Sequence, residues 1–219
     1  MPNEPLIRWS WVTGHIGEIG AALGQHVELT VIAMAVGLAI SFALALFAHR
    51  YRRAQAPITW VAGVIYTIPS LALFVLLIPV TGLSTTTSEI GLVGYTLLIL
   101  IRNILAGLAG VPADVLEAAD AMGLTRPQRL LRVELPIALP VIMAGIRIAT
   151  VTTIGLVTVT ALIGQGGLGQ LMLSGFISLF PTQIYVGALL SVALAVIADA
   201  MLLLVQRLLT PWTRRVGRA

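Results

Sequence analysis

Five stretches of this chain are each long and apolar enough to cross a lipid bilayer as a helix. A transmembrane helix needs about 20 largely apolar residues, whereas a transmembrane strand is shorter and alternates in polarity. Of the 219 residues 58% are hydrophobic and only 10% are charged, which excludes a soluble globular or a disordered chain. We therefore predict an all-α integral membrane protein with spans at residues 27–48, 58–80, 90–110, 138–163 and 183–209.

The basic residues are all arginines, and their distribution predicts the orientation of the spans. Nine of them fall in three alternating segments outside the spans, at residues 49–57, 111–137 and 210–219. The other segments outside the spans contain only Arg8; they are residues 1–26, 81–89 and 164–182. Because arginines accumulate on the cytoplasmic side, we expect the N-terminus outside and the C-terminus in the cytoplasm. The arginines form no stripe with interleaved aromatic side chains, so nucleic acid is not an expected partner.

The residues before the first span have the pattern of a helix that lies on the membrane surface. Apolar residues recur there at spacings of three and four: Trp9, Val12, Ile16, Ile19 and Leu23. We interpret residues 7–24 as an external interfacial helix, with a loosely ordered tail as the alternative. The start of the chain lacks the pattern of a cleavable signal peptide, so we expect the first span to be retained. The predicted layout is one membrane domain, with an external segment 1–26, a transmembrane region 27–209 and a cytoplasmic tail 210–219.

The predicted cytoplasmic loop 111–136 contains two signals for the start of a helix. Asp114 stands three residues before Glu117, and Thr125 stands three residues before Gln128, as in a capping box. Gly123 lies between them, where a helix commonly ends in a left-handed residue. We therefore predict two short helices joined at Gly123.

The second of these short helices is basic and is followed by two prolines. Arg126, Arg129 and Arg132 recur at three-residue spacing, which places them near one another on the helix surface. Pro136 and Pro140 follow, and proline disrupts the interior of a helix. We therefore expect the second helix to end before the fourth span begins.

The loop resembles the EAA signature of permease subunits of ATP-binding-cassette (ABC) importers. The matching positions are Glu117, Ala118, Ala119, Gly123, Val133, Leu135 and Pro136. The family usually has isoleucine where this chain has Val133, which is a mild departure. The resemblance implies that the loop, including Arg126 and Arg129, docks on a separate cytoplasmic ATPase subunit. A surface hairpin without a partner is the alternative.

The resemblance extends over residues 57–205 and looks closest to the permeases for the osmoprotectants glycine betaine, carnitine and choline. It is carried by residues 66–74, 101–111, 116–149 and 161–169. It implies a bacterial cell-membrane protein that forms a pore with a second copy or a related permease. An external solute-binding (lipo)protein would deliver the solute, and ATP with Mg²⁺ would bind the ATPase subunit. An importer for amino acids or another small solute, a membrane enzyme or ion channel, and a structural membrane partner are the alternatives.

Three charged residues fall inside predicted spans: Arg102, Arg147 and Asp199. A charged side chain at the centre of a bilayer costs about 2.5 to 3.5 kcal/mol, so each of them needs a stabilising environment. All three would lie roughly 12 to 15 Å from the cytoplasmic boundary. We predict that Asp199 pairs with Arg147 or Arg102 near the inner part of a solute pathway. The alternative is that both arginines reach the headgroups and Asp199 makes only a polar contact.

The second span is interrupted near its middle by polar residues and a proline: Tyr66, Thr67, Pro69 and Ser70. Pro69 frees a backbone carbonyl that needs a partner, and broken helices often line a transport pathway. A simple packing kink is the alternative. Asn103 in the third span likewise lines a pathway or bonds a neighbouring helix.

The sequence patterns of enzymes are absent or out of place. Gly164, Gly166 and Gly169 form a GxGxxG pattern, but it follows an apolar run of membrane length and no acidic residue follows about 20 positions later. We expect an external turn there, leading into a re-entrant or interfacial segment 170–181. The chain has no cysteine and no lysine, and its three histidines are scattered. We therefore expect no catalytic residue, metal site or bound cofactor in this chain.

Overall fold

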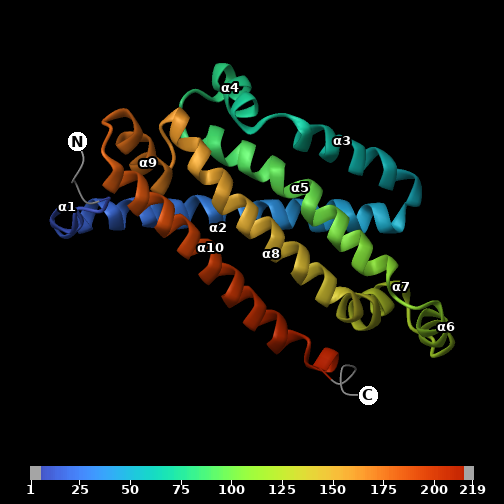
Figure 1. Ribbon diagram of the computed structural model, residues 1–219. Helices are drawn as coiled ribbons and strands as arrows, with labels where there is room; N and C mark the ends of the chain where they lie inside the picture. Colours follow the sequence, from blue (N-terminus) through green and yellow to red (C-terminus); the bar gives the residue numbers. More distant parts are fainter. Residues whose placement is uncertain (1–5, 215–219) are drawn as a thin grey trace.

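The computed structural model describes residues 6–214, which form helices joined by turns and no strand (Figure 1). Residues 215–219 of the predicted tail lie outside the described part. The helix pair α6 and α7 lies at the opposite end of the molecule from α1 and α9. The α-helices are α1 (Trp9–Gly14), α2 (Ile16–Arg50), α3 (Gln55–Thr67), α4 (Ser70–Thr81), α5 (Thr85–Ala109), α6 (Ala113–Ala121), α7 (Arg126–Arg129), α8 (Leu135–Val159), α9 (Leu168–Ile177) and α10 (Pro181–Leu209).

The long helices confirm the prediction of an all-helical membrane protein with four to five apolar candidate spans. Four helical segments are each long and apolar enough to cross a membrane: α2, α5, the continuous segment Arg126–Ile163 and α10. The pair α3 and α4, which is bent by 97°, is the fifth candidate when it is counted as one span. The bend lies at the predicted break, between Thr67 and Ser70.

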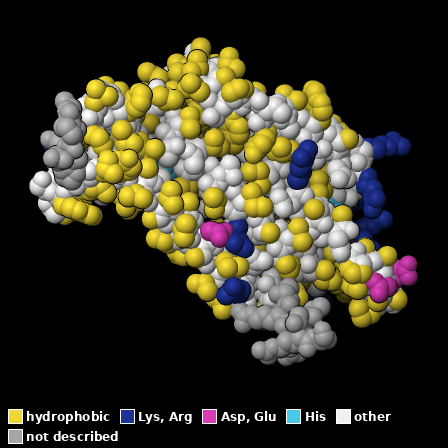
Figure 2. All heavy atoms as spheres, in the orientation of Figure 1, with side chains coloured by type: hydrophobic (Ala, Val, Ile, Leu, Met, Phe, Trp, Pro, Cys, Tyr) yellow, Lys and Arg dark blue, Asp and Glu magenta, His cyan; other side chains and the backbone are white. Residues whose placement is uncertain are grey.

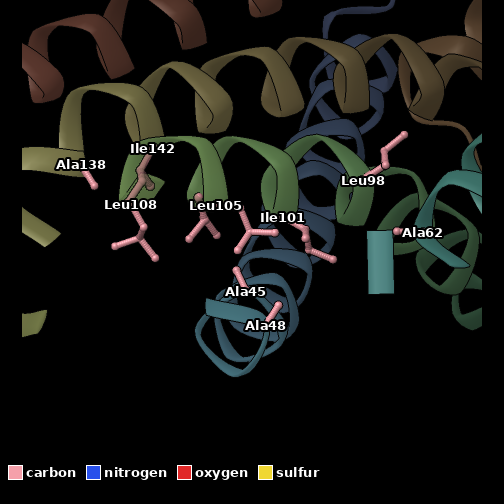
Figure 3. Close-up of a cluster of buried hydrophobic side chains, with 10 residues drawn as sticks. Ala45, Ala48, Ala62, Leu98, Ile101, Leu105, Leu108, Ala138 and Ile142 are labelled. Atoms are coloured by element: carbon pink, nitrogen blue, oxygen red, sulfur yellow. The ribbon is translucent and has the colours of Figure 1, made fainter. Parts of the chain in front are cut away.

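Helix α5 is the centre of the fold, and it packs against α2 on one side and α8 on the other. More than half of its most apolar stretch is buried, compared with 6% for α10. Figure 3 shows the core cluster, in which large side chains of α5 meet alanines of the neighbouring helices. Ile101, Leu105 and Leu108 belong to α5, whereas Ala45 lies on α2 and Ala138 on α8. Small residues let helix backbones approach closely, which is how membrane helices gain packing energy without a hydrophobic effect.

The N-terminal segment is divided at His15 rather than forming one interfacial helix. Helix α1 ends at Gly14, and α2 begins at Ile16 and runs without a break into the first span. The Trp11 ring stacks on His15 at 4.4 Å and meets the edge of Phe180 at 5.6 Å. The backbone N–H of Arg8 also donates to the Thr182 hydroxyl at 3.0 Å. The segment is thus attached to the first turn of α10.

The prediction that Pro136 and Pro140 end the second loop helix is wrong. Helix α7 continues through a π-helical segment, Leu130–Glu134, directly into α8. The N–H of Leu135 donates to the Leu130 carbonyl five residues earlier, so the helix is wider immediately before Pro136. A proline ring normally clashes with the carbonyl four residues before it, and a widened turn relieves this contact. Pro140 lies inside α8, where packing against other helices tolerates it.

Candidate functional site

The loop 111–136 folds as two short helices joined by a left-handed glycine, as predicted. Gly123 has φ of +76°, and a Cβ built on it meets no atom within 4 Å. Its N–H donates to the Asp120 carbonyl at 2.9 Å, and the N–H of Leu124 donates to the Ala119 carbonyl at 3.2 Å. These two bonds form a Schellman motif, which ends helices at glycine. Glycine is therefore required here for its backbone conformation and not for lack of space.

The two short helices begin with different N-terminal capping arrangements. At α7 the predicted capping box is present, and the backbone N–H of Thr125 donates to Gln128 Oε1 at 2.9 Å. At α6 the prediction needs correction, because the residue before the helix is Pro112 and Asp114 lies inside the first turn. Pro112 has an extended backbone, with ψ of 142°, that leads into the helix. The Asp114 carboxylate instead accepts from the N–H of Val115 at 2.9 Å.

The residues of the EAA signature divide between the surface and the interior. Glu117, Ala118 and Gly123 are exposed, whereas Ala119 is 1% exposed. Leu135 and Pro136 lie half-buried in the first turn of α8. Helix α6 thus has one exposed face of small and acidic residues, while Ala119 packs it against the rest of the protein.

A network of charged side chains joins this hairpin to the membrane helices. Arg129 Nη1 donates to both carboxylate oxygens of Asp120, at 2.9 and 2.7 Å. Arg129 Nε donates to Glu134 Oε1 at 2.9 Å, and His49 Nε2 lies 2.8 Å from Glu134 Oε2. The Glu134 side chain is only 4% exposed. This charged network therefore connects α6, α7 and the π-helical segment to the end of α2.

The sequence analysis identified only one residue of this charged network, Arg129. Asp120 and Glu134 are unmarked positions within the signature, and His49 was dismissed as one of three scattered histidines. Glu134 does carry a signal, since an acid directly before an apolar span needs a partner once it is buried. No local pattern identifies that partner, because His49 lies 85 residues away in the sequence.

The predicted ion pair within the spans is present between Arg147 on α8 and Asp199 on α10. Arg147 Nε and Nη2 each donate to one carboxylate oxygen at 2.8 Å, which is the bidentate geometry of strong arginine–carboxylate pairs. Figure 2 shows an acidic and a basic side chain side by side in the region of α8 and α10, among largely hydrophobic side chains. Arg102 is exposed, and no ion pair of its side chain is found within the described residues. The role of these residues in a pathway stays a prediction.

The break in the second span is held by a tyrosine of α5. Helix α3 ends at Thr67 and α4 begins at Ser70, so Pro69 stands at the bend. The Tyr95 hydroxyl donates to the Ile68 carbonyl, which satisfies a backbone group that the break leaves unpaired. The ring of Tyr66 meets Tyr95 edge to face at 5.8 Å. This geometry fits both a pathway lining and a packing kink.

Asn103 is engaged within the helix bundle. Its amide donates to the Ile99 carbonyl of its own helix at 2.8 Å. Its Cβ lies against Gly145 of α8, where a Cβ built on the glycine is only 2.3 Å away. The expected bond to a neighbouring helix is thus replaced by close packing against one.

The glycine-rich turn is a structural connection between α8 and α9. Gly164 and Gly167 both have positive φ, and α9 follows as a short apolar helix. The N–H of Gly167 donates to the Gln25 side chain on α2 at 3.1 Å. The described residues contain no group of three or more potential metal ligands.

Comparison with known proteins identifies the family. Residues 35–215 match the model of the family described as "Binding-protein-dependent transport system inner membrane component". The chain is 34% identical to the choline transport system permease protein OpuBB of Bacillus subtilis, over 89% of this chain and 90% of the relative. It is 37% identical to the glycine betaine/carnitine/choline transport system permease protein OpuCD of the same species, over 88% and 85%. It is 34% identical to the osmoprotectant import permease protein OsmW of Salmonella typhimurium, over 92% and 96%.

A solved structure shares the fold. A chain from the inward-facing MetNI methionine ABC transporter matches with a TM-score of 0.76 at 23% identity, covering 86% of this chain and 94% of that one. The likeness in fold, the EAA loop and the family match agree with one another. The chain is a multi-pass membrane protein that belongs to the binding-protein-dependent transport system inner membrane component family.

Proposed function

We propose that this chain is the permease subunit of an ABC importer for osmoprotectants, that is, quaternary amines such as glycine betaine, choline or carnitine. The observation that carries the proposal is the similarity to three permeases named for these solutes, which extends over at least 85% of each relative. The likeness to the methionine transporter concerns the fold alone, so methionine is not the preferred solute.

The loop 111–136 is the surface that receives the ATPase subunit. That subunit binds ATP and Mg²⁺, and the permease itself has no catalytic residue. Two features support this assignment: α6 exposes Glu117 and Ala118, and Gly123 creates a compact hairpin that projects from the end of the molecule (Figure 1). Positive charge concentrated in and around this loop supports a cytoplasmic position for the loop and the C-terminus. The N-terminus and the glycine-rich turn then lie outside, where a solute-binding protein docks.

The solute crosses between this chain and a second permease, either another copy or a related chain. The α3–α4 break, the Arg147–Asp199 pair and the α5 residues Arg102 and Asn103 are polar features that would line such a pathway. An ion pair within a membrane protein typically faces a protein interior or a water-filled cavity and not lipid. ATP-driven movement at the loop then biases the molecule between two states of access, as any coupled two-state element requires.

Co-purification with an osmoprotectant-type ATPase tests this proposal. The variant Gly123→Asp disturbs the hairpin, because a non-glycine residue at φ of +76° is strained and a new charge enters the docking surface. Gly164→Asp is the matched control: Gly164 also has a left-handed backbone, with φ of +81°, and open space around it, but it lies in the turn before α9. We expect wild type and Gly164→Asp to bind the ATPase and Gly123→Asp to lose it.

The solute is tested with the same complex by measuring ATP hydrolysis with the binding protein and glycine betaine, choline or carnitine. Stimulation by one of these solutes supports the proposal. A complex that responds only to an amino acid would keep the permease assignment and reject the osmoprotectant. Failure of wild type to bind any such ATPase would reject the assignment of the loop.

A further inference from the structure

A polar cleft of about 650 Å³ lies between the end of α2 and the loop hairpin. From α6 it is lined by Leu116 and Asp120, which are four residues apart and so share one helix face. The exposed residues Glu117 and Ala118 do not line it. The cleft and the surface proposed for the ATPase are therefore on different faces of α6.

The cleft has an excess of positive charge. Arg50, Arg52 and Arg126 line it, and in the described part of the chain none of them forms an ion pair. The two carboxylates that line the cleft, Asp120 and Glu134, already bind Arg129, and Glu134 also contacts His49. The three arginines therefore have guanidinium donors available for an external anion.

The residues around the cleft are of the kinds that gather where a membrane meets water. Phe47 and Tyr51 stand at the end of α2 with about half of each side chain exposed, and the Arg50 guanidinium lies 5.2 Å from the Tyr51 ring. Aromatic residues collect at the membrane–water interface, and basic residues collect just beyond it. Leu46, Leu116 and Leu130 provide apolar walls beside the arginines. A ligand with both an anionic head and an apolar body fits this combination.

We propose that the cleft binds the phosphate headgroup of an anionic phospholipid. A guanidinium binds phosphate through two parallel N–H donors, and basic pockets between membrane helices on the cytoplasmic side bind anionic headgroups. The lipid would occupy the space between α2 and the hairpin, beside the Glu134–His49 contact. The proposal does not depend on the solute. Residues of the loop 111–136, Arg126 among them, line the cleft, so the test has to separate lipid binding from ATPase binding.

The test measures lipid binding to the full-length chain in detergent by native mass spectrometry. Phosphatidylglycerol is compared with phosphatidylcholine that carries the same acyl chains. The cleft variant is Arg50→Gln with Arg52→Gln, and the matched control is Arg53→Gln with Arg132→Gln, which removes the same charge from exposed arginines that do not line the cleft. Each charge-assisted hydrogen bond to the phosphate contributes about 10-fold in affinity, so the cleft variant, which lacks two guanidinium groups, is expected to lose roughly 100-fold. The control is expected to retain the affinity of wild type.

Further arms identify the source of the phosphate and exclude misfolding. Arg50→Lys with Arg52→Lys keeps the charge but lacks the paired donors, so it is expected to restore only part of the binding. Millimolar inorganic phosphate is expected not to displace the lipid; if it does displace it, the site takes a soluble anion and the lipid assignment fails. Equal loss in the cleft and control variants would also overturn the proposal. So would unchanged lipid binding together with lost ATPase binding in the cleft variant, which would assign these arginines to the ATPase interface.

Discussion

Arg129 is the residue that fastens the loop hairpin to the membrane helices. Its guanidinium donates to Asp120 on α6 and to Glu134 in the π-helical segment, so it connects both sides of the turn at Gly123. The variant Arg129→Gln removes the charge and leaves both carboxylates in place. We expect the hairpin to open more often while the spans stay folded, because the hydrogen-bond partners of Arg129, Asp120 and Glu134, lie outside the buried apolar clusters.

The free energy by which Arg129 stabilises the hairpin can be estimated from the exposure of its two carboxylate partners. The Asp120 side chain is 57% exposed, and an exposed ion pair contributes at most about 1 kcal/mol. The Glu134 side chain is 4% exposed, and a hydrogen bond to a charged group contributes about 1.5 to 3 kcal/mol. Glu134 keeps its contact with His49, so the lower part of the range applies. A loss of roughly 2 kcal/mol corresponds to about a 30-fold increase in the population of the open hairpin.

Amide hydrogen exchange measures this opening directly, because local opening exposes the backbone of one cooperative unit. We expect faster exchange in residues 116–134 of the Arg129→Gln variant and unchanged exchange in α5. Arg132→Gln is the control, since Arg132 is exposed and has no ion pair within residues 6–212. If the Arg129→Gln variant exchanges like wild type, or if the Arg132→Gln variant exchanges as fast as Arg129→Gln, the charged network does not hold the hairpin closed and the reasoning is refuted.

Three further substitutions have defined outcomes. Gly123→Ala adds backbone strain without a clash and is expected to destabilise the hairpin by roughly 1 to 2 kcal/mol. Amide hydrogen exchange in the hairpin would then be faster, and an unchanged exchange rate would contradict the left-handed turn. Gly145→Ala places a methyl group against Asn103 and is expected to cost about 1 to 3 kcal/mol, measured as a lower thermal midpoint in detergent. Asp199→Asn leaves Arg147 without its carboxylate and is expected to reduce solute uptake, and the double variant Asp199→Arg with Arg147→Asp to recover part of it. Full uptake by Asp199→Asn would show that the pair has no role.

The features predicted correctly from the sequence are those with local signals. The turn at Gly123 and the capping box at Thr125 are specified by residues within four positions, so they do not depend on the rest of the fold. The pair between Arg147 and Asp199 is predictable for an energetic reason, because a charge inside an apolar span needs a counter-charge. The sequence left the choice between Arg102 and Arg147 open, because it depends on how α8 and α10 pack.

The features that sequence reasoning missed depend on tertiary contacts or on an unusual helical turn. The rule that proline ends a helix assumes regular α-helical geometry, and the π-helical segment before Pro136 removes that assumption. The single interfacial helix at residues 7–24 was an interpretation of apolar spacing alone. That spacing continues into the first span, so it contains no signal for the division at His15.

The continuity of α7 with α8 determines how a movement at the loop would reach the membrane helices. Had Pro136 ended the helix, the hairpin would be attached to the fourth span by a flexible connection and could move without it. The observed segment Arg126–Ile163 is instead one continuous helix, so a displacement of α7 is passed to α8 as a rigid body. Glu134 on this helix contacts His49 of α2, and Arg147 on the same helix binds Asp199 of α10. We infer that the continuous helix Arg126–Ile163 transmits a movement of the loop, and that its contacts through Glu134 and Arg147 extend this movement to α2 and α10, which are distant from the loop in the sequence.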